Sequence, residues 1–223
     1  MSSYFSTPAF HAQRELNAIG VTLNRGQILE VQAALFGYHH FQEMQPDLAS
    51  ITYHLENNAP WVVLQADMGL MRLSSLGMKW LHQQALQIIQ SRLPIQYLFR
   101  DDNHFLIEHF VGGVFRDWVL ADGNEEIWQA QQKIEHRCDV FVRDDVDFGD
   151  LINERAEVWE GSVGAQLHQR RGNGSVAYDD KYINIGARIR FQKLGRVLLE
   201  PDAKIALGAT AVLPQGGMGG IEL

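Results

Sequence analysis

The strongest constraint on the fold is a strict alternation between apolar and polar residues at positions 183–191. Successive side chains of a β-strand point to opposite faces, so one face of this run is apolar. The opposite face carries Asn184, Arg188 and Arg190. The apolar set is Ile183, Ile185, Ala187, Ile189 and Phe191. The pattern predicts a half-buried strand of an antiparallel sheet, with a basic face in water.

Residues 1–58 are predicted to form a small helical module. Asn24 can cap a helix, Gln27 can complete a capping box, and Gly37 follows the last apolar residue of the stripe. That stripe consists of Ile28, Val31 and Leu35, which recur at helical spacing. We expect a preceding helix from Thr7 to Gly20 and a third helix that begins at Asp47.

The chain as a whole is predicted to be α+β. We expect a mixed, mostly antiparallel β-sheet domain at 59–215, with a possible sub-boundary near 143–160, and a flexible glycine-rich tail at 216–223. One long helix at 74–92 carries a wide apolar stripe and is expected to pack on the sheet. Further helices are expected at 124–135 and 147–159, and strands at 61–65, 95–99, 104–110, 114–120, 138–142, 163–167 and 206–213, with another near 197.

Composition limits the cellular compartment and the class of binding partner that we expect for this chain. The single cysteine, Cys138, excludes an internal disulfide and fits a reducing cytoplasm. The N-terminus lacks the pattern of a signal peptide, and no apolar run is long enough to span a membrane. The formal net charge of −8 disfavours broad nucleic-acid affinity, because such affinity depends on neutralising phosphates.

Charge is unevenly distributed along the C-terminal half. Positions 135–160 hold nine acidic residues and three arginines, whereas positions 169–196 hold seven basic residues and two aspartates. One interpretation is that the two segments face each other or face solvent. The other is an anion-binding contact surface made by Arg188, Arg190, Lys193 and Arg196.

The segment at 24–44 resembles a known bacterial module. Gln27, Leu29, Glu30, Ala33, Gly37 and Tyr38 match its pattern, with Phe41 and Met44 in place of a tryptophan and a leucine. In these respects it is similar to the short helical module of uncharacterised bacterial plasmid-related and glyoxalase-superfamily proteins. The resemblance implies a bacterial, mobile-element origin and supplies no catalytic residue.

A divalent metal site is the alternative function class. The expected orders of elements at 61–120 and 138–191 resemble the paired modules of the vicinal oxygen chelate fold, for which Glu108, His109 and His136 could supply part of a metal site. A nuclease-type site for magnesium could use Asp67 and the four aspartates of one acidic run. These four are Asp144, Asp145, Asp147 and Asp150. The competing interpretation is that all these aspartates are turn and helix-cap residues.

These observations lead to one functional expectation and two alternatives. We expect a non-catalytic accessory or regulatory protein that needs no cofactor and binds another macromolecule, a protein partner, because no catalytic signature is present. The first alternative is a divalent-metal-dependent enzyme of glyoxalase-like or nuclease type. The second is a nucleic-acid binder that uses the basic C-terminal face.

Overall fold

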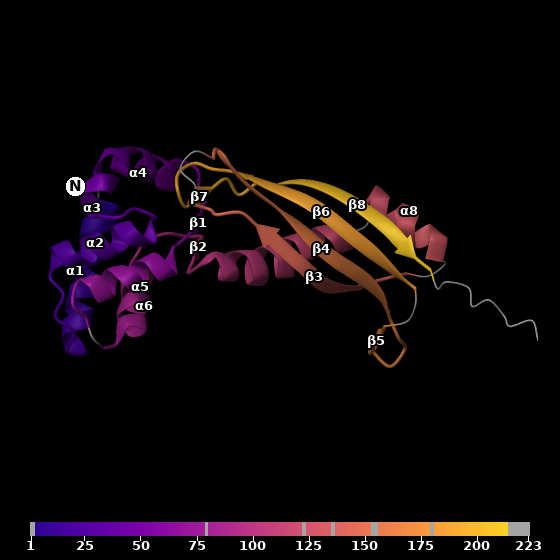
Figure 1. Ribbon diagram of the computed structural model, residues 1–223, viewed down its shortest axis with the longest axis horizontal. Helices are drawn as coiled ribbons and strands as arrows, with labels where there is room; N and C mark the ends of the chain where they lie inside the picture. The colour runs from indigo at the N-terminus through magenta and orange to yellow at the C-terminus, as the bar shows by residue number, and fades with distance from the viewer. Residues whose placement is uncertain are drawn as a thin grey trace, which may run out of the picture. The chain divides into compact units, whose positions relative to one another are not determined.

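The computed structural model describes residues 3–78, 80–121, 124–134, 137–152, 156–178 and 181–213. The fold is α+β, with helices in the N-terminal region and mostly antiparallel sheets, as predicted (Figure 1). The chain divides into two compact units. Unit 1 comprises Met1–Leu106, Asp150–Trp159 and Phe191–Ala203; unit 2 comprises Ile107–Gly149, Glu160–Arg190 and Lys204–Leu223. None of the described helices is both long and apolar enough to cross a membrane.

Unit 1 is built around the capped helix that the sequence predicts. Its helices are α1 (Ser3–Ala18), α2 (Arg25–Leu35), α3 (Phe41–Met44), η1 (Gln45–Asp47), α4 (Leu48–Asn57), α5 (Ala66–Ser75) and α6 (His82–Ser91). The capping box is present: the Asn24 side chain accepts from the Gln27 backbone N–H at 2.9 Å, and Gln27 reciprocates at 2.9 Å. Gly37 ends the helix region with φ +82°, which favours glycine.

A small sheet completes unit 1. Strand β1 (Trp61–Val63) lies between β2 (Leu98–Phe99), to which it is parallel, and β7 (Leu198–Leu199), to which it is antiparallel. Val62 and Leu64 are fully buried in one cluster with residues of the helices, so the sheet and the helices share a core. The helix residues of this cluster include Ile28, Leu35 and Ile89. The strand expected near 197 is therefore observed as β7.

The single long helix expected at 74–92 is wrong. The structure has α5 and α6 instead, joined by a turn in which Gly77 has φ +82° and Leu81 has φ +61°. Two left-handed residues within five positions cannot continue an α-helix. The apolar stripe that suggested one helix therefore belongs to two helices that pack against each other.

Unit 2 consists of helices on one side of a curved sheet. The helices are η2 (His104–Phe115), whose first turn belongs to unit 1, α7 (Arg116–Leu120) and α8 (Glu125–Ile134). The sheet has the order β3-β4-β6-β8, with β5 paired to β4. These strands are β3 (Val140–Phe148), β4 (Val158–Arg170), β5 (Val176–Ala177), β6 (Tyr182–Gln192) and β8 (Lys204–Val212). The helix expected at 124–135 is confirmed as α8, and the alternating strand is confirmed as β6.

The strands expected at 104–110 and 114–120 are wrong, because the segment is helical. Element η2 is a π-helix, whose hydrogen bonds link residues five apart. Phe105, Phe110 and Phe115 recur at that spacing, and all three are fully buried. A Cβ atom on Gly112 would lie 2.8 Å from the Ile107 carbonyl oxygen, so this turn requires glycine.

The helix expected at 147–159 is also wrong. Strand β3 continues to Phe148 and β4 already begins at Val158. The order of elements that suggested the vicinal oxygen chelate fold is consequently not observed in either segment compared with it. The glycine-rich tail expected at 216–223 lies outside the described residues.

Candidate functional site

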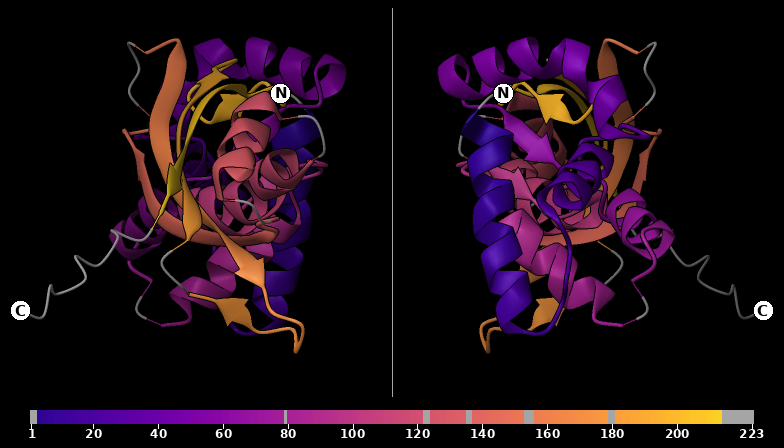
Figure 2. Two further views of the ribbon diagram at one scale, coloured as in Figure 1. Left: turned by 90° about the vertical axis from the view of Figure 1, so that its right-hand side faces the viewer. Right: turned by 90° about the vertical axis from the view of Figure 1, so that its left-hand side faces the viewer.

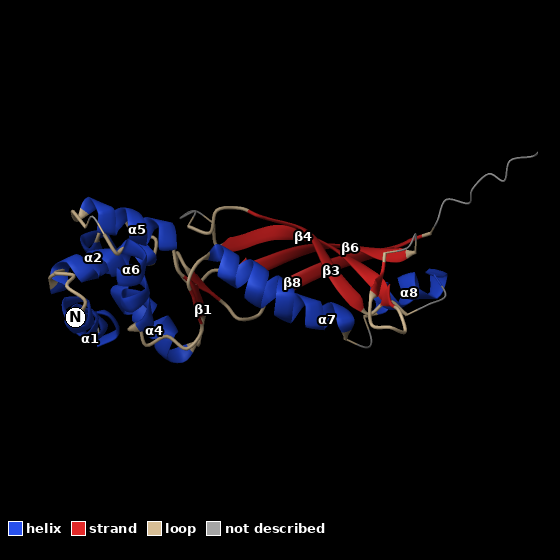
Figure 3. Cartoon of the chain, turned by 90° about the horizontal axis from the view of Figure 1, so that it is seen from below, coloured by secondary structure: helices blue, strands red, loops and turns tan. Residues whose placement is uncertain are grey.

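The face of the unit 2 sheet that carries Arg188, called the outer face here, is turned to solvent. The opposite face is buried: Ile183, Ile185 and Ile189 of β6 are at most 3% exposed. That inner face packs on helices, since the rings of Phe141 and Phe115 lie 6.0 Å apart. The views in Figures 2 and 3 show the helix that leads into α7 along one side of the strands. The wet, basic strand face predicted from the alternation is therefore present.

Three cations gather at one end of the outer face and form what we call the basic patch: Arg188, Arg190 and Lys204. On β8, Lys204 lies directly opposite Arg190, and Ala206 lies opposite Arg188. The Nε of Arg190 lies 2.9 Å from Oε2 of Glu160. Within the described part of the chain, Arg188 and Lys204 have no ion pair. Among the described residues, the patch thus carries more positive charge than its ion pairs neutralise.

The other two predicted contact residues belong to unit 1, where both are engaged internally. The Lys193 ammonium donates to the Leu151 carbonyl at 2.6 Å, and burial lowers the pKa of this amine. Arg196 donates to the Gly37 carbonyl at 2.8 Å and to the Glu43 carboxylate at 2.8 Å. Only the Arg188 and Arg190 half of the predicted group is on the outer face.

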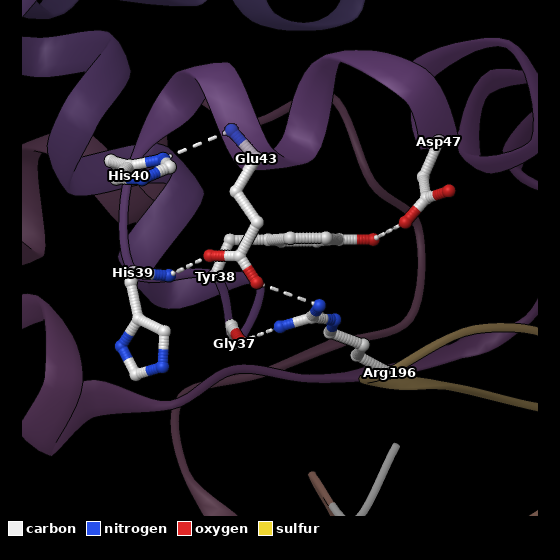
Figure 4. Close-up of polar contacts among 7 residues, drawn as sticks. All are labelled: Gly37, Tyr38, His39, His40, Glu43, Asp47 and Arg196. Carbon is white, nitrogen blue, oxygen red and sulfur yellow. Dashed lines mark hydrogen bonds and ion pairs between the residues drawn. The ribbon is translucent and has the colours of Figure 1, made fainter. Parts of the chain in front are cut away.

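Arg196 lies at the centre of a polar cluster that forms around the segment after the C-terminal end of α2 (Figure 4). Its guanidinium carbon lies 4.0 Å from the centre of the Tyr38 ring, and the Tyr38 hydroxyl donates to Asp47 at 2.8 Å. Burial, with the Asp47 carboxylate beside the phenol, raises the pKa of Tyr38 above its ordinary range. Burial alone would raise the pKa of Glu43, but hydrogen bonds from the His39 backbone and from Arg196 outweigh it and lower this pKa.

The same cluster borders a cleft of about 440 Å³ within unit 1. Its lining includes Lys193 and Arg196, but also the carboxylates of Asp47 and Glu157. The charges of the lining therefore balance, and Arg196 is already bound to Glu43. This arrangement holds the loop after α2 against the segment before β7, which is a structural task.

Those candidate metal ligands that the structure describes do not assemble into one site. Glu108 and His109 lie on η2, and His136 lies outside the described residues. Asp144, Asp145 and Asp147 are exposed on β3, where a bulge falls between Arg143 and Asp145, so they are neither turn nor helix-cap residues. Asp67 lies in the first turn of α5, in the other unit. Across the described ranges, no three His, Cys, Asp or Glu side chains are close enough to hold a metal ion.

Two features of the outer face were missed in the sequence. Lys204 extends the alternation of β8 by one pair beyond the expected start at position 206, so it could have been found from the pattern. The stacking of Tyr182 on His168 depends on the alignment of β4 with β6, which the sequence does not specify.

Comparison of the chain with models of protein families, with curated proteins and with solved structures finds no match. No relative therefore contributes to the assignment of a function. The resemblance of the segment at 24–44 to a plasmid-related module stays a prediction. The functional argument rests on the outer face and on its chemistry.

Proposed function

We propose that this protein is a non-catalytic binding protein, of accessory or regulatory type, that binds an anionic macromolecule through the basic patch. The observation that carries the proposal is the exposure of Arg188 and Lys204 on an open sheet face, with no ion pair inside the described structure. Their arrangement on the strands also supports the proposal.

The basic patch opposes the stability of the sheet. Arg190 and Lys204 are cross-strand partners, and like charges directly opposite each other on one face are destabilising. Glu160 offsets only part of this repulsion, through its ion pair with Arg190. An anionic partner would relieve the remainder, so the patch suits a surface that is neutralised on binding.

The chain's net charge of −8 determines the range and the affinity that we expect for the interaction. A strongly acidic protein repels a polyanion at long range, so attraction depends on local contact with the patch. We expect moderate affinity that falls as salt concentration rises. The acidic side chains of β3, at the far edge of the same sheet, confine the anion to the β6 and β8 side.

Charge reversal tests the proposal. The full chain with Arg188→Glu and Lys204→Glu is compared with a control carrying Arg14→Glu and Lys133→Glu, two exposed cations on helices α1 and α8. Both variants change the net charge equally. Binding to two immobilised polyanions, polyglutamate and a single-stranded oligonucleotide, is measured at low and at physiological salt.

We expect the patch variant to lose binding at least tenfold more than the control variant. Equal losses in the two variants would show that only net charge matters and would overturn the proposal. A wild-type chain that bound neither of the two polyanions would overturn it as well. Circular dichroism of both variants establishes that the reversals leave the fold intact.

A further inference from the structure

The outer face has an aromatic end as well as a basic end. The His168 ring stacks on Tyr182 with a centroid distance of 5.2 Å and an interplanar angle of 21°. Tyr178 lies over the same histidine at 5.1 Å and is 71% exposed, whereas His168 is only 4% exposed. His168 is held further by the Gln166 side chain at 2.9 Å. Tyr178 is thus an exposed ring on a rigid aromatic base.

His168 and Tyr182, at the aromatic end, lie on the same face of β4 and β6 as Arg188 and Arg190 of the basic patch. Tyr182 and Arg188 are both at even positions of β6, and side chains two apart on a strand share a face. The contacts of His168 with Tyr182 and of Glu160 with Arg190 place β4 beside β6 in one continuous alignment. At roughly 3.3 Å per residue, the path from Tyr182 to Arg188 measures about 20 Å.

Small and uncharged residues occupy the middle of this path. Gly186 lies opposite Gly208 on β8, and a Cβ atom on Gly186 would meet nothing within 4 Å. Asn184, opposite Thr210, provides an exposed amide between the glycine and the aromatic end. A ligand lying along β6 would therefore meet the Tyr178 ring, then the Asn184 amide, then the exposed backbone at Gly186, and finally the cations of the basic patch.

We propose that the anionic partner of the outer face is single-stranded nucleic acid, a few nucleotides of which lie along β4 and β6 from Tyr178 to the basic patch. This inference rests on the proposed function and names its partner. One base stacks on Tyr178, the Asn184 amide contacts a base edge, and Arg188 and Lys204 contact phosphates. Stacking platforms combined with a basic track are how proteins bind single strands without strong sequence preference.

The chemistry of the face favours a single strand over an acidic protein or a duplex. An acidic protein would use the basic patch but would have no need of the exposed Tyr178 ring at the opposite end of the path. In a duplex the bases are already stacked on each other, so their faces are not available to Tyr178. Asp145 and Asp147, on the outer edge strand β3, repel a second phosphate backbone on that side.

Fluorescence anisotropy with a labelled ten-nucleotide oligothymidylate tests the inference on the full chain. Tyr178→Ala should weaken binding by about fivefold to a hundredfold, the range for loss of one stacked base, and Tyr178→Phe should retain it. The Arg188→Glu and Lys204→Glu variant should reduce binding at least tenfold. A duplex of the same length should bind more weakly than the single strand.

The outcomes separate this inference from the proposed function. If the patch variant loses binding to polyglutamate while oligothymidylate never binds, the partner is an acidic protein; the proposed function then stands and this inference is overturned. If oligothymidylate binds but Tyr178→Ala has no effect, the stacking path is overturned. If the patch variant and the Arg14→Glu, Lys133→Glu control lose affinity equally, both proposals fail.

Discussion

Replacement of Arg196 by methionine should destabilise unit 1 by about 2–3 kcal/mol. Methionine keeps the length of the side chain but removes the guanidinium. The change deletes the hydrogen bonds to the Gly37 carbonyl and to the Glu43 carboxylate, each 2.8 Å long. It also removes a cation that lies 4.0 Å from the centre of the Tyr38 ring.

The magnitude follows from the burial of the ion pair. The side chains of Arg196 and Glu43 are 17% and 25% exposed, so the pair lies between the two known limits. Exposed pairs contribute about 0–1 kcal/mol, and loss of one partner of a buried pair costs about 3–5 kcal/mol. The cation–π contact adds about 0.5–1 kcal/mol, part of which the apolar methionine replaces.

Urea unfolding measures the effect, and the chain offers a matched control. Arg92 forms an ion pair with Glu15, again between residues distant in sequence, but the side chains are 45% and 38% exposed. Arg92→Met should therefore cost under about 1 kcal/mol. The two variants are compared with the wild-type chain. If the slope of unfolding free energy against urea concentration is unchanged, a shift of the unfolding midpoint reports a change in stability. If Arg196→Met were no more destabilising than Arg92→Met, the cluster would not stabilise unit 1 in the way described.

Three further results are expected. Because the pKa of Glu43 is lowered in the folded chain, its stabilisation is present at neutral pH and is lost as pH falls through that pKa; Glu43→Gln should flatten the acid limb of the stability curve. Gly112→Ala should cost about 1–3 kcal/mol, because its Cβ meets the Ile107 carbonyl, whereas Gly113→Ala, with open space around it, should be nearly neutral or stabilising in thermal unfolding. Asn24→Ala should cost about 1 kcal/mol through loss of the cap, and an unchanged melting temperature would contradict the role of the capping box.

Prediction from the sequence succeeded where one local pattern admits a single structure. A strict period of two, as in β6, can bury one face only as a strand, so both the strand and its basic face were predictable. The cap and stop of α2 were predictable for a similar reason, since Asn24, Gln27 and Gly37 act within a few residues of themselves. The basic pair Arg188 and Arg190 followed directly from that strand.

Prediction failed where the pattern suited more than one structure. The segment at 104–120 is rich in aromatic and β-branched residues and contains Gly112 and Gly113, which together are typical of strands and a turn. Phe105, Phe110 and Phe115 recur every five residues, a spacing that fits neither an α-helical stripe nor the alternation of a strand, and the π-helix that the structure shows is rare. Because π-helices are rare, the sequence alone favours two strands and a turn over the helix that the structure shows.

Contacts between residues far apart in the sequence could not be predicted from the sequence. Arg196 was grouped with Arg188 because they are close in sequence, but its partners are Gly37, Tyr38 and Glu43. The positive charge of a segment does not show which of its cations form ion pairs or hydrogen bonds inside the fold. The aromatic end of the outer face was missed likewise, since it depends on which residue of β4 lies beside Tyr182.

The place of β7 in the small sheet of unit 1 has a consequence for the newborn chain. Trp61 and Val62 of β1 pair with Leu199 and Leu198, which lie 138 and 136 residues farther along the chain. While the ribosome is still elongating the chain, the helices of unit 1 can form, but the sheet edge at β1 stays open. An open edge invites pairing with other chains. We expect the nascent protein to depend on chaperone protection until β7 has been synthesised, and fragments that end before β7 to aggregate.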